Sequence, residues 1–174
     1  IYVSNIGNVP TDEKDNDGSV SIINLDGEIL KKHWVTGINA PKGLSFFNDK
    51  LFVTDINEVV KIDIETGSIE KKYGVENAVF LNDLDIDKNG DVYFTDSRDS
   101  KVYKLTNDEV SLWLDMEGLN PNGILVEENR ILVVSFSKGD FIAIDKETKQ
   151  RSVIATGIVG GDGIVAIKTG YIVS

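Results

Sequence analysis

The sequence of 174 residues contains no cysteine and a single histidine, His33. The absence of cysteine excludes disulfide bonds, thiol catalysis and metal sites built from thiolates. A single histidine also excludes a zinc site that needs several histidines. A metal ion bound by this chain would therefore have oxygen ligands, which favours calcium, magnesium or manganese.

Positive charge and long apolar runs are scarce as well. The chain has 18 Lys and Arg against 29 Asp and Glu, which gives a formal net charge of −11. Because no basic stripe is present, electrostatics argue against nucleic acid and an anionic membrane surface as partners. No apolar run approaches the roughly 18 residues of a membrane-spanning helix. The overall balance, 41% hydrophobic and 27% charged residues, is typical of a globular protein.

The chain begins with isoleucine instead of methionine, and both ends, IYVSN and GYIVS, have the pattern of strands. We therefore expect a piece of a longer protein. Neither the compartment nor the oligomeric state is readable from such a piece.

Four short motifs recur at a constant spacing. They are PKGL at 41–44, LNDL at 81–84, PNGI at 121–124 and GDGI at 161–164. Each motif begins 40 residues after the previous one, a period in the range of β-propeller blades. A polar insertion, GNVPTDEKDNDGS, lengthens the unit before the first motif and is expected to be a surface loop.

Within each period the pattern is that of strands. LSFFNDKLFVTD, LDIDKNGDVYFTD and ILVEENRILVVS each predict strand, tight turn, strand, and two more strand patterns follow. No segment has a sustained helical period. We therefore predict an all-β fold, a β-propeller of four-stranded antiparallel blades. About four blades of a six-bladed ring are expected, in a single domain over residues 1–174.

The segment Leu81–Ser97 also resembles a calcium-binding loop in the spacing of its acidic residues. An EF-hand loop needs flanking helices and a bidentate Glu at its last position, which here is Asp96. The alternating flanks and the Asn-Gly pair instead predict a β-hairpin. In that hairpin Gly90 supplies a positive φ, and Asp87 and Asp91 are expected to be solvated turn residues.

The period places Lys42, Asn82, Asn122 and Asp162 in equivalent positions at the start of each inner strand. Inner strands of a propeller enter the central channel from the same face, so these residues are expected to converge. Two amide oxygens and a carboxylate would form an oxygen-rich cage for a hard cation. The alternative is that the Asn-Gly and Asp-Gly pairs only make the turn into each strand.

The order and spacing of LND at 81–83, PNG at 121–123 and GDG at 161–163 resemble the gluconolactonase/regucalcin family, also called senescence marker proteins. The resemblance covers nearly the whole chain. It implies a six-bladed propeller with one divalent metal in the central channel and lactonase activity. Calcium is the metal we expect, with zinc, magnesium or manganese as alternatives.

Carried over residue by residue, the resemblance makes Asn122 and Asp162 metal ligands. Asn82 becomes the neighbouring contact to the substrate or to a metal-bound water. A further ligand of that family, a Glu of the first blade, would lie upstream of Ile1.

Two positions depart from the family pattern. Phe80 stands where sugar-lactone members often carry an Arg, so a less polar lactone or ester is expected as the small-molecule substrate. Lys42 is not a plausible ligand; it could pair with Asp83, contact an anionic substrate or be structural. The predicted substrate-binding residues are therefore Asn82, Phe80 and Lys42.

The expected chemistry is metal-assisted opening of a lactone or related ester. Asp162 would orient the attacking water or accept its proton, and Asn82 would hydrogen-bond the substrate or water. His33 lies in an outer-strand pattern, which argues against a Ser-His-Asp mechanism, and Trp34 and Trp113 are expected in interblade packing. Strand-end residues could also face the channel or simply hydrogen-bond the strand ends: Asp96, Ser97, Ser135, Phe136 and Ser137.

Two readings from other classes stay open. The chain could be a non-catalytic propeller of the NHL or YncE-like kind, with a structural metal or none. A propeller similar to strictosidine synthase, without metal, is less favoured because it gives the Asn and Asp residues no purpose.

Overall fold

The computed structural model describes all residues, 1–174, as β-strands joined by turns and loops, without a helix. None of its elements is a helix long and apolar enough to cross a membrane. The chain divides into two compact units, unit 1 (Ile1–Ala78) and unit 2 (Val79–Ser174). A single domain over the whole chain stays a prediction.

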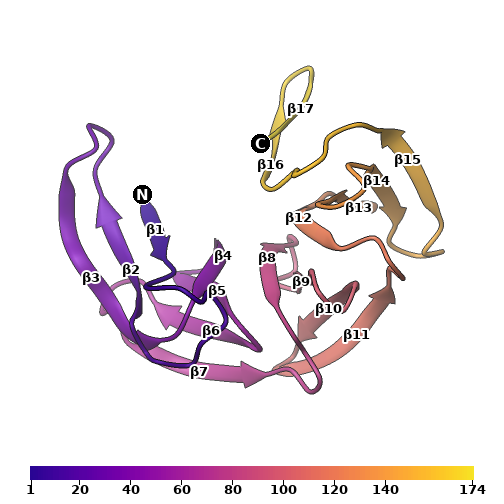
Figure 1. Cartoon of the computed structure of the whole chain (residues 1–174). Coiled ribbons are helices and arrows are strands. Elements are labelled where there is room, and N and C mark those ends of the chain that lie inside the picture. The colour runs from indigo at the N-terminus through magenta and orange to yellow at the C-terminus, as the bar shows by residue number, and fades with distance from the viewer. The chain divides into compact units, whose positions relative to one another are not determined.

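Unit 1 contains two antiparallel sheets (Figure 1). The first has the strand order β1 (Tyr2–Asn5), β2 (Gly18–Ile23), β3 (Ile29–Ile38). The second has the order β4 (Pro41–Phe47), β5 (Lys50–Asp55), β6 (Glu58–Asp63), β7 (Ile69–Gly74). The polar insertion between β1 and β2 forms turns and is mostly exposed, as expected.

Unit 2 contains two four-stranded sheets and one strand pair. The first sheet is β8 (Leu81–Ile86), β9 (Val92–Asp96), β10 (Lys101–Thr106), β11 (Glu109–Asp115). The second is β12 (Pro121–Val126), β13 (Arg130–Ser135), β14 (Phe141–Asp145), β15 (Arg151–Ala155). The pair is β16 (Ile164–Ile167) and β17 (Gly170–Val173).

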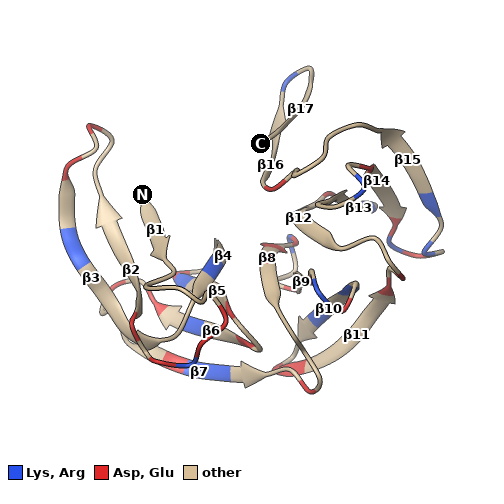
Figure 2. Ribbon diagram, viewed as in Figure 1, with Lys and Arg blue, Asp and Glu red and all other residues tan.

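Each sheet places consecutive strands side by side, all antiparallel, which is the construction of a propeller blade. Three blades have four strands, and the first and last sheets have three and two. The predicted all-β fold with about four blades is therefore confirmed as part of a propeller. Acidic and basic residues are scattered over the strands and loops of both units, without a basic stripe (Figure 2).

The core lies between neighbouring sheets. In unit 2, residues of β9 and β10 pack on residues of β12, β13 and β14 around the fully buried Met116. Trp113 packs against this cluster, with its ring edge-to-face on Tyr93 at 5.5 Å. In unit 1, Trp34 packs in the same way beside Tyr2. The expectation that both tryptophans serve packing between sheets is confirmed.

The segment from Asp85 to Asp96 forms the predicted hairpin and not a calcium loop. Gly90 has a φ of 88° in its turn. The expectation of solvated aspartates is wrong, however. Asp87 is only 8% exposed, and its carboxylate accepts hydrogen bonds from the backbone of Asn89 and Asp91.

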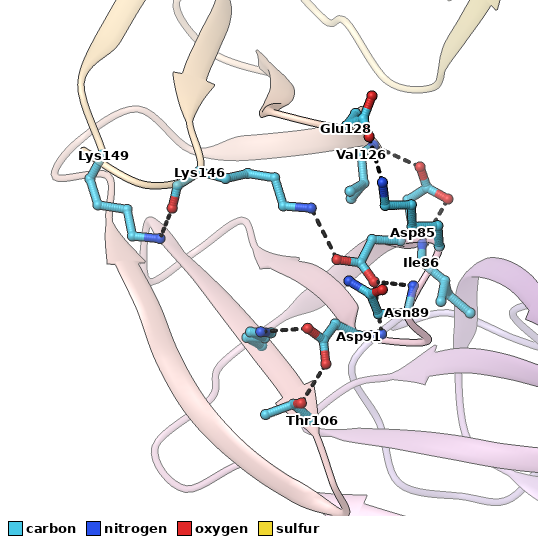
Figure 3. A network of polar contacts seen from close by, with 12 residues as sticks. Asp85, Ile86, Asn89, Asp91, Thr106, Val126, Glu128, Lys146 and Lys149 are labelled. Carbon is cyan, nitrogen blue, oxygen red and sulfur yellow. Dashed lines mark hydrogen bonds and ion pairs between the residues drawn. The ribbon is translucent and has the colours of Figure 1, made fainter.

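The carboxylate of Asp87 also pairs with Lys146 Nζ at 3.0 Å, and Asp91 pairs with Lys104 Nζ at 2.6 Å (Figure 3). Lys146 belongs to the turn between β14 and β15 of the next sheet. Local turn chemistry could not reveal a partner that lies 59 positions away along the chain.

Candidate functional site

A repeated bulge begins the inner strand of each four-stranded sheet. In β8 the pairing with β9 shifts by one residue between Leu81 and Leu84, so Asn82 and Asp83 stand opposite Thr95 alone. The same shift occurs at the start of β4 and of β12. Bulges re-aim side chains and are frequent beside active sites. The motifs of the 40-residue period are therefore places where the strand departs from regular pairing.

Three of the four period-related residues meet in unit 2. Asn82 Nδ2 donates a hydrogen bond to Asn122 Oδ1, and Asn122 Nδ2 donates to Asp162 Oδ1 at 3.0 Å. Asn122 is 3% exposed, whereas Asp162 is exposed. The expected convergence of these three side chains is thus found. Their roles as ligands and catalytic groups stay predictions.

Gly123 allows this approach. A Cβ atom at Gly123 would lie 1.6 Å from the carbonyl oxygen of Asp162, so no other residue fits without movement of the backbone. Gly123 lies within β12, and its φ is not in the left-handed region. The alternative that this Asn-Gly pair only makes a turn is therefore wrong, because the glycine serves the close contact of two chain segments.

Two carboxylates of β8 bind the backbone of β12. The N–H of Ile124 donates to Asp83 Oδ2 at 3.0 Å, and the N–H of Val126 donates to Asp85 Oδ2 at 2.7 Å. The inner strand β12 pairs with β13 only, on its other side. Because buried N–H groups need acceptors, the two aspartates complete the inner edge of the second sheet.

The Asp83 carboxyl group lies in an unusual electrostatic environment. Burial raises the pKa of Asp83 to about 7, against the hydrogen bonds from the backbone of Ile124 and Leu84. The negative charges of Asp85 and Asp162 raise the pKa further. The site therefore contains one carboxyl group that is protonated in weak acid, close to the exposed carboxylate of Asp162.

A pocket of about 370 Å³ opens beside Asn82 and Asn122. Side-chain hydrogen bonds join some of its lining residues: Asn120 Nδ2 donates to the Ser97 carbonyl at 3.0 Å, and Ser137 Oγ donates to Asn120 Oδ1 at 2.7 Å. Phe80 and Phe136 add two apolar rings to the lining. The lining residues are Phe80, Asn82, Ser97, Arg98, Asn120, Asn122, Phe136 and Ser137.

Sequence reasoning missed two of the lining residues, Asn120 and Arg98. The guanidinium carbon of Arg98 lies 4.2 Å from the centroid of the Phe80 ring, within the range of a cation–π contact. Phe80 stands where sugar-lactone members of the gluconolactonase/regucalcin family often carry an Arg. The pocket nevertheless contains an arginine, which comes from the loop after β9. The available signal was its position next to Ser97, already a candidate at the strand end.

The other strand-end candidates divide into two groups. Asp96 is fully buried and accepts the backbone N–H groups of Val79 and Phe80 at 2.6 and 3.1 Å. Ser135 Oγ bonds to the carbonyl of Leu119. These two residues hold the entry to the inner strand of their own sheet and are structural, whereas Ser97, Phe136 and Ser137 line the pocket.

Lys42 and His33 lie in unit 1. Lys42 Nζ donates to the carbonyl of Ala40 at 2.9 Å, which agrees with the structural reading, and its predicted role toward substrate stays a prediction. His33 is exposed on β3, with Nδ1 2.8 Å from Ser19 Oγ.

The side chains of the site can be compared with the ligands that a metal ion requires. No three or more His, Asp or Glu side chains of the chain are arranged to hold one. Asp162 offers a carboxylate, and Asn122 and Asn82 offer amide oxygens once an amide turns by half a rotation about its last bond. A set of oxygens with a single carboxylate suits a hard cation such as calcium better than zinc.

No protein-family model and no curated protein matches this sequence. Among solved structures, virginiamycin B lyase from Staphylococcus aureus is similar, with 24% identity and a TM-score of 0.65 over 83% of this chain and 52% of that chain. A streptogramin B lyase is similar with 16% identity and a TM-score of 0.70, over 89% of this chain and 54% of that chain. A chain of the nidogen/laminin complex is similar with 14% identity and a TM-score of 0.70, over 84% of this chain and 61% of that chain.

The chain thus spans about half the length of the lyases it resembles. At these identities the likeness defines the fold, which is that of a β-propeller. The class of protein defined by fold and pocket together is a propeller with a polar, amide-rich site at the start of its inner strands.

Proposed function

We propose that this chain belongs to a metal-dependent propeller hydrolase that opens a lactone or a related ester. The observation that carries the proposal is the hydrogen-bonded series Asn82–Asn122–Asp162 beside a pocket. Three residues at equivalent positions of successive inner strands supply amides and one exposed carboxylate. A small acyl compound fits the size of this pocket.

The residues would divide the reaction as follows. Asn82 donates a hydrogen bond to the substrate, and the Asp162 carboxylate accepts a proton from the attacking water. The water oxygen adds to the carbonyl carbon, the ring C–O bond breaks, and the departing oxygen takes up a proton to give a hydroxy acid. A divalent cation held by Asn122 and Asp162 would polarise the carbonyl group.

The test is hydrolysis of a panel of lactones and aryl esters by the full-length protein, with calcium and with a chelator. We expect activity that needs calcium and falls on the order of 100-fold in Asn122→Ala and in Asp162→Ala, a typical cost for loss of such groups. Matched controls are Asn129→Ala and Asp26→Ala, which lie in exposed turns. Full activity in Asp162→Ala would refute the assignment.

A non-catalytic binding module is the second candidate. Its support is that the Asn122 amide is paired on both sides within the chain, with Asn82 and with Asp162. One structural neighbour comes from a complex of two proteins, nidogen and laminin. A folded, calcium-bound protein that hydrolyses nothing in a broad panel would favour this function.

The similarity to lyases supports lyase activity for this chain less than the pocket supports hydrolysis or binding. A histidine-to-alanine variant of the S. aureus enzyme is described as catalytically inactive. The pocket of unit 2 contains no histidine, and His33 lies on β3 of unit 1 with Ser19 as its partner. The pocket therefore does not supply the residue type on which that enzyme depends.

A further inference from the structure

The pocket of unit 2 is built from two successive blades that contribute equivalent positions. Leu81 pairs with Asp96 in one sheet, and Pro121 pairs with Ser135 in the next, so these register pairs correspond. Counting from them, the eight lining residues form four equivalent pairs: Phe80 with Asn120, Asn82 with Asn122, Ser97 with Phe136, and Arg98 with Ser137.

Three of these pairs differ in chemistry between the blades. The first blade places an aromatic ring before its inner strand, Phe80, whereas the second places its ring after β13, Phe136. Phe136 is 53% exposed although it is a large apolar side chain. The pocket therefore combines an apolar ring from each blade with amide and hydroxyl side chains.

The two blades also differ in the charge that they contribute to the pocket. Arg98 is the one ionisable side chain that lines the pocket, in a chain with a formal net charge of −11. Its guanidinium lies against the face of Phe80 at 4.2 Å, a contact that orients the plane of the group. A guanidinium binds a carboxylate through two parallel N–H groups, which gives it geometric selectivity.

We propose that this pocket binds an aryl-substituted carboxylate, with its flat apolar group against Phe80 and Phe136 and its carboxylate on Arg98. If the proposed hydrolase function holds, on which this substrate assignment rests, the carboxylate is the hydroxy acid released from an aryl lactone. The pocket then selects aryl lactones over sugar lactones, whose hydroxyl groups would face two phenyl rings. A ligand of about a dozen non-hydrogen atoms suits a pocket of this size.

Binding is measured first, without metal, so that it does not depend on catalysis. The probe is 4-hydroxy-4-phenylbutyrate, titrated calorimetrically into the full-length protein in EDTA, with its neutral amide and gluconate as comparison ligands. We expect the aryl acid to bind on the order of tenfold more tightly than either, from the charge-assisted bonds to Arg98 and the burial of the ring.

Two variants separate the contacts. Arg98→Gln is expected to weaken the acid about tenfold and leave the amide unchanged, and Phe136→Ala is expected to weaken both ligands about fivefold. The matched controls Arg151→Gln and Phe46→Ala remove an exposed side chain of the same type outside the pocket and should bind as wild type. Gluconate binding as tightly as the aryl acid, or Arg98→Gln binding unchanged, would overturn the assignment.

Hydrolysis then distinguishes this inference from the function on which it rests. Suppose that the aryl acid binds as expected but that γ-phenyl-γ-butyrolactone is not hydrolysed in the presence of calcium. This result would support the pocket assignment and contradict the hydrolase function. Faster hydrolysis of gluconolactone than of the aryl lactone would support the hydrolase and contradict the aryl selectivity.

Discussion

Among single residues, Asp83 couples the candidate site to stability most directly. Its carboxyl group is bound by the backbone of Ile124 and Leu84 but lies among the charges of Asp85 and Asp162. Burial raises its pKa to about 7, so the folded state holds the proton more tightly than the unfolded chain. The stabilisation is complete below the unfolded pKa, near 4, and is lost as the pH rises through 7.

We therefore predict that Asp83→Asn removes part of the pH dependence of stability. The wild-type free energy of unfolding should fall by roughly 2–3 kcal/mol between pH 5 and 8 because of this group, and that of Asp83→Asn should fall much less. Urea titrations at several pH values measure this. Parallel curves for the two proteins would contradict the raised pKa, whatever their absolute stability.

Arg98 is a pocket residue that could not be predicted from the sequence. Asn82, Asn122 and Asp162 were predictable as a group because a 40-residue period puts them in register. Arg98 has no equivalent charged residue in the next blade, where Ser137 stands. Its contact with Phe80 joins two loops of one sheet, and no periodic pattern reports such a contact.

At the scale of elements, β8 connects the pocket to the opposite end of its sheet. Alternate side chains of β8 and its turn face the next blade: Asp83 binds Ile124, Asp85 binds Val126 (Figure 3), and Asp87 pairs with Lys146. Although burial opposes it, the hydrogen bond from Lys146 and those from the turn hold the pKa of Asp87 below its usual value. The two blades share no sheet hydrogen bonds, and Asp83 and Asp85 instead accept N–H groups of β12, to which Asp87 adds an ion pair.

This arrangement predicts energetic coupling between Asp87 and Lys146. Their side chains are 7% and 18% exposed, so each charge loses most of its hydration. We expect Asp87→Ala to cost about 2–3 kcal/mol, Lys146→Met about 1–2 kcal/mol, and the double variant about 1 kcal/mol less than the sum. A urea-based double-mutant cycle, with exposed Lys168→Met as control, measures the coupling. Additive costs would show that the pair does not join the blades.

The strands themselves were predictable, and the bulges were not. Alternating apolar residues and the Asn-Gly turn located β9 and the end of β8, because those signals are local, whereas the pattern began at Leu84 and β8 begins at Leu81. The shift that turns Asn82 and Asp83 toward the next blade depends on pairing with Thr95 and on Ile124 of another sheet. Such features require the tertiary structure, which is why Asp87 also looked solvated in the sequence.

For the whole molecule, the propeller fold says less about function than the pocket does. Neighbours with the same architecture include lyases and a chain of a two-protein complex, and propellers support both catalysis and binding. The pocket, in contrast, has an asymmetry that a repeated blade does not require. At two pairs of equivalent positions, one blade has a polar side chain where the other has an aromatic ring.

The pH dependence of the stability of the whole chain is set by two groups of carboxyl residues with opposite effects. Several carboxylates in both units have a lowered pKa because they accept bonds from lysines or backbone groups, among them Asp63, Glu70, Asp87, Glu128 and Asp145. Their stabilisation is present above the unfolded pKa and is lost as the pH falls through the folded pKa. Asp83 acts in the opposite direction, and the net charge of −11 adds repulsion at neutral pH.

We therefore predict that the thermal midpoint of the full-length protein is highest near pH 5 and falls on both sides. The acid side reflects protonation of the paired carboxylates, and the side above pH 6 reflects ionisation of Asp83 together with charge repulsion. Circular dichroism melts from pH 3 to 8 at constant ionic strength measure this curve. Because salt screens exposed pairs and long-range repulsion more than it affects the desolvation of Asp83, 0.5 M salt should flatten the acid side more than the neutral side. Asp83→Asn should flatten only the neutral side, and a midpoint that rises steadily from pH 4 to 8 would contradict the assigned role of Asp83.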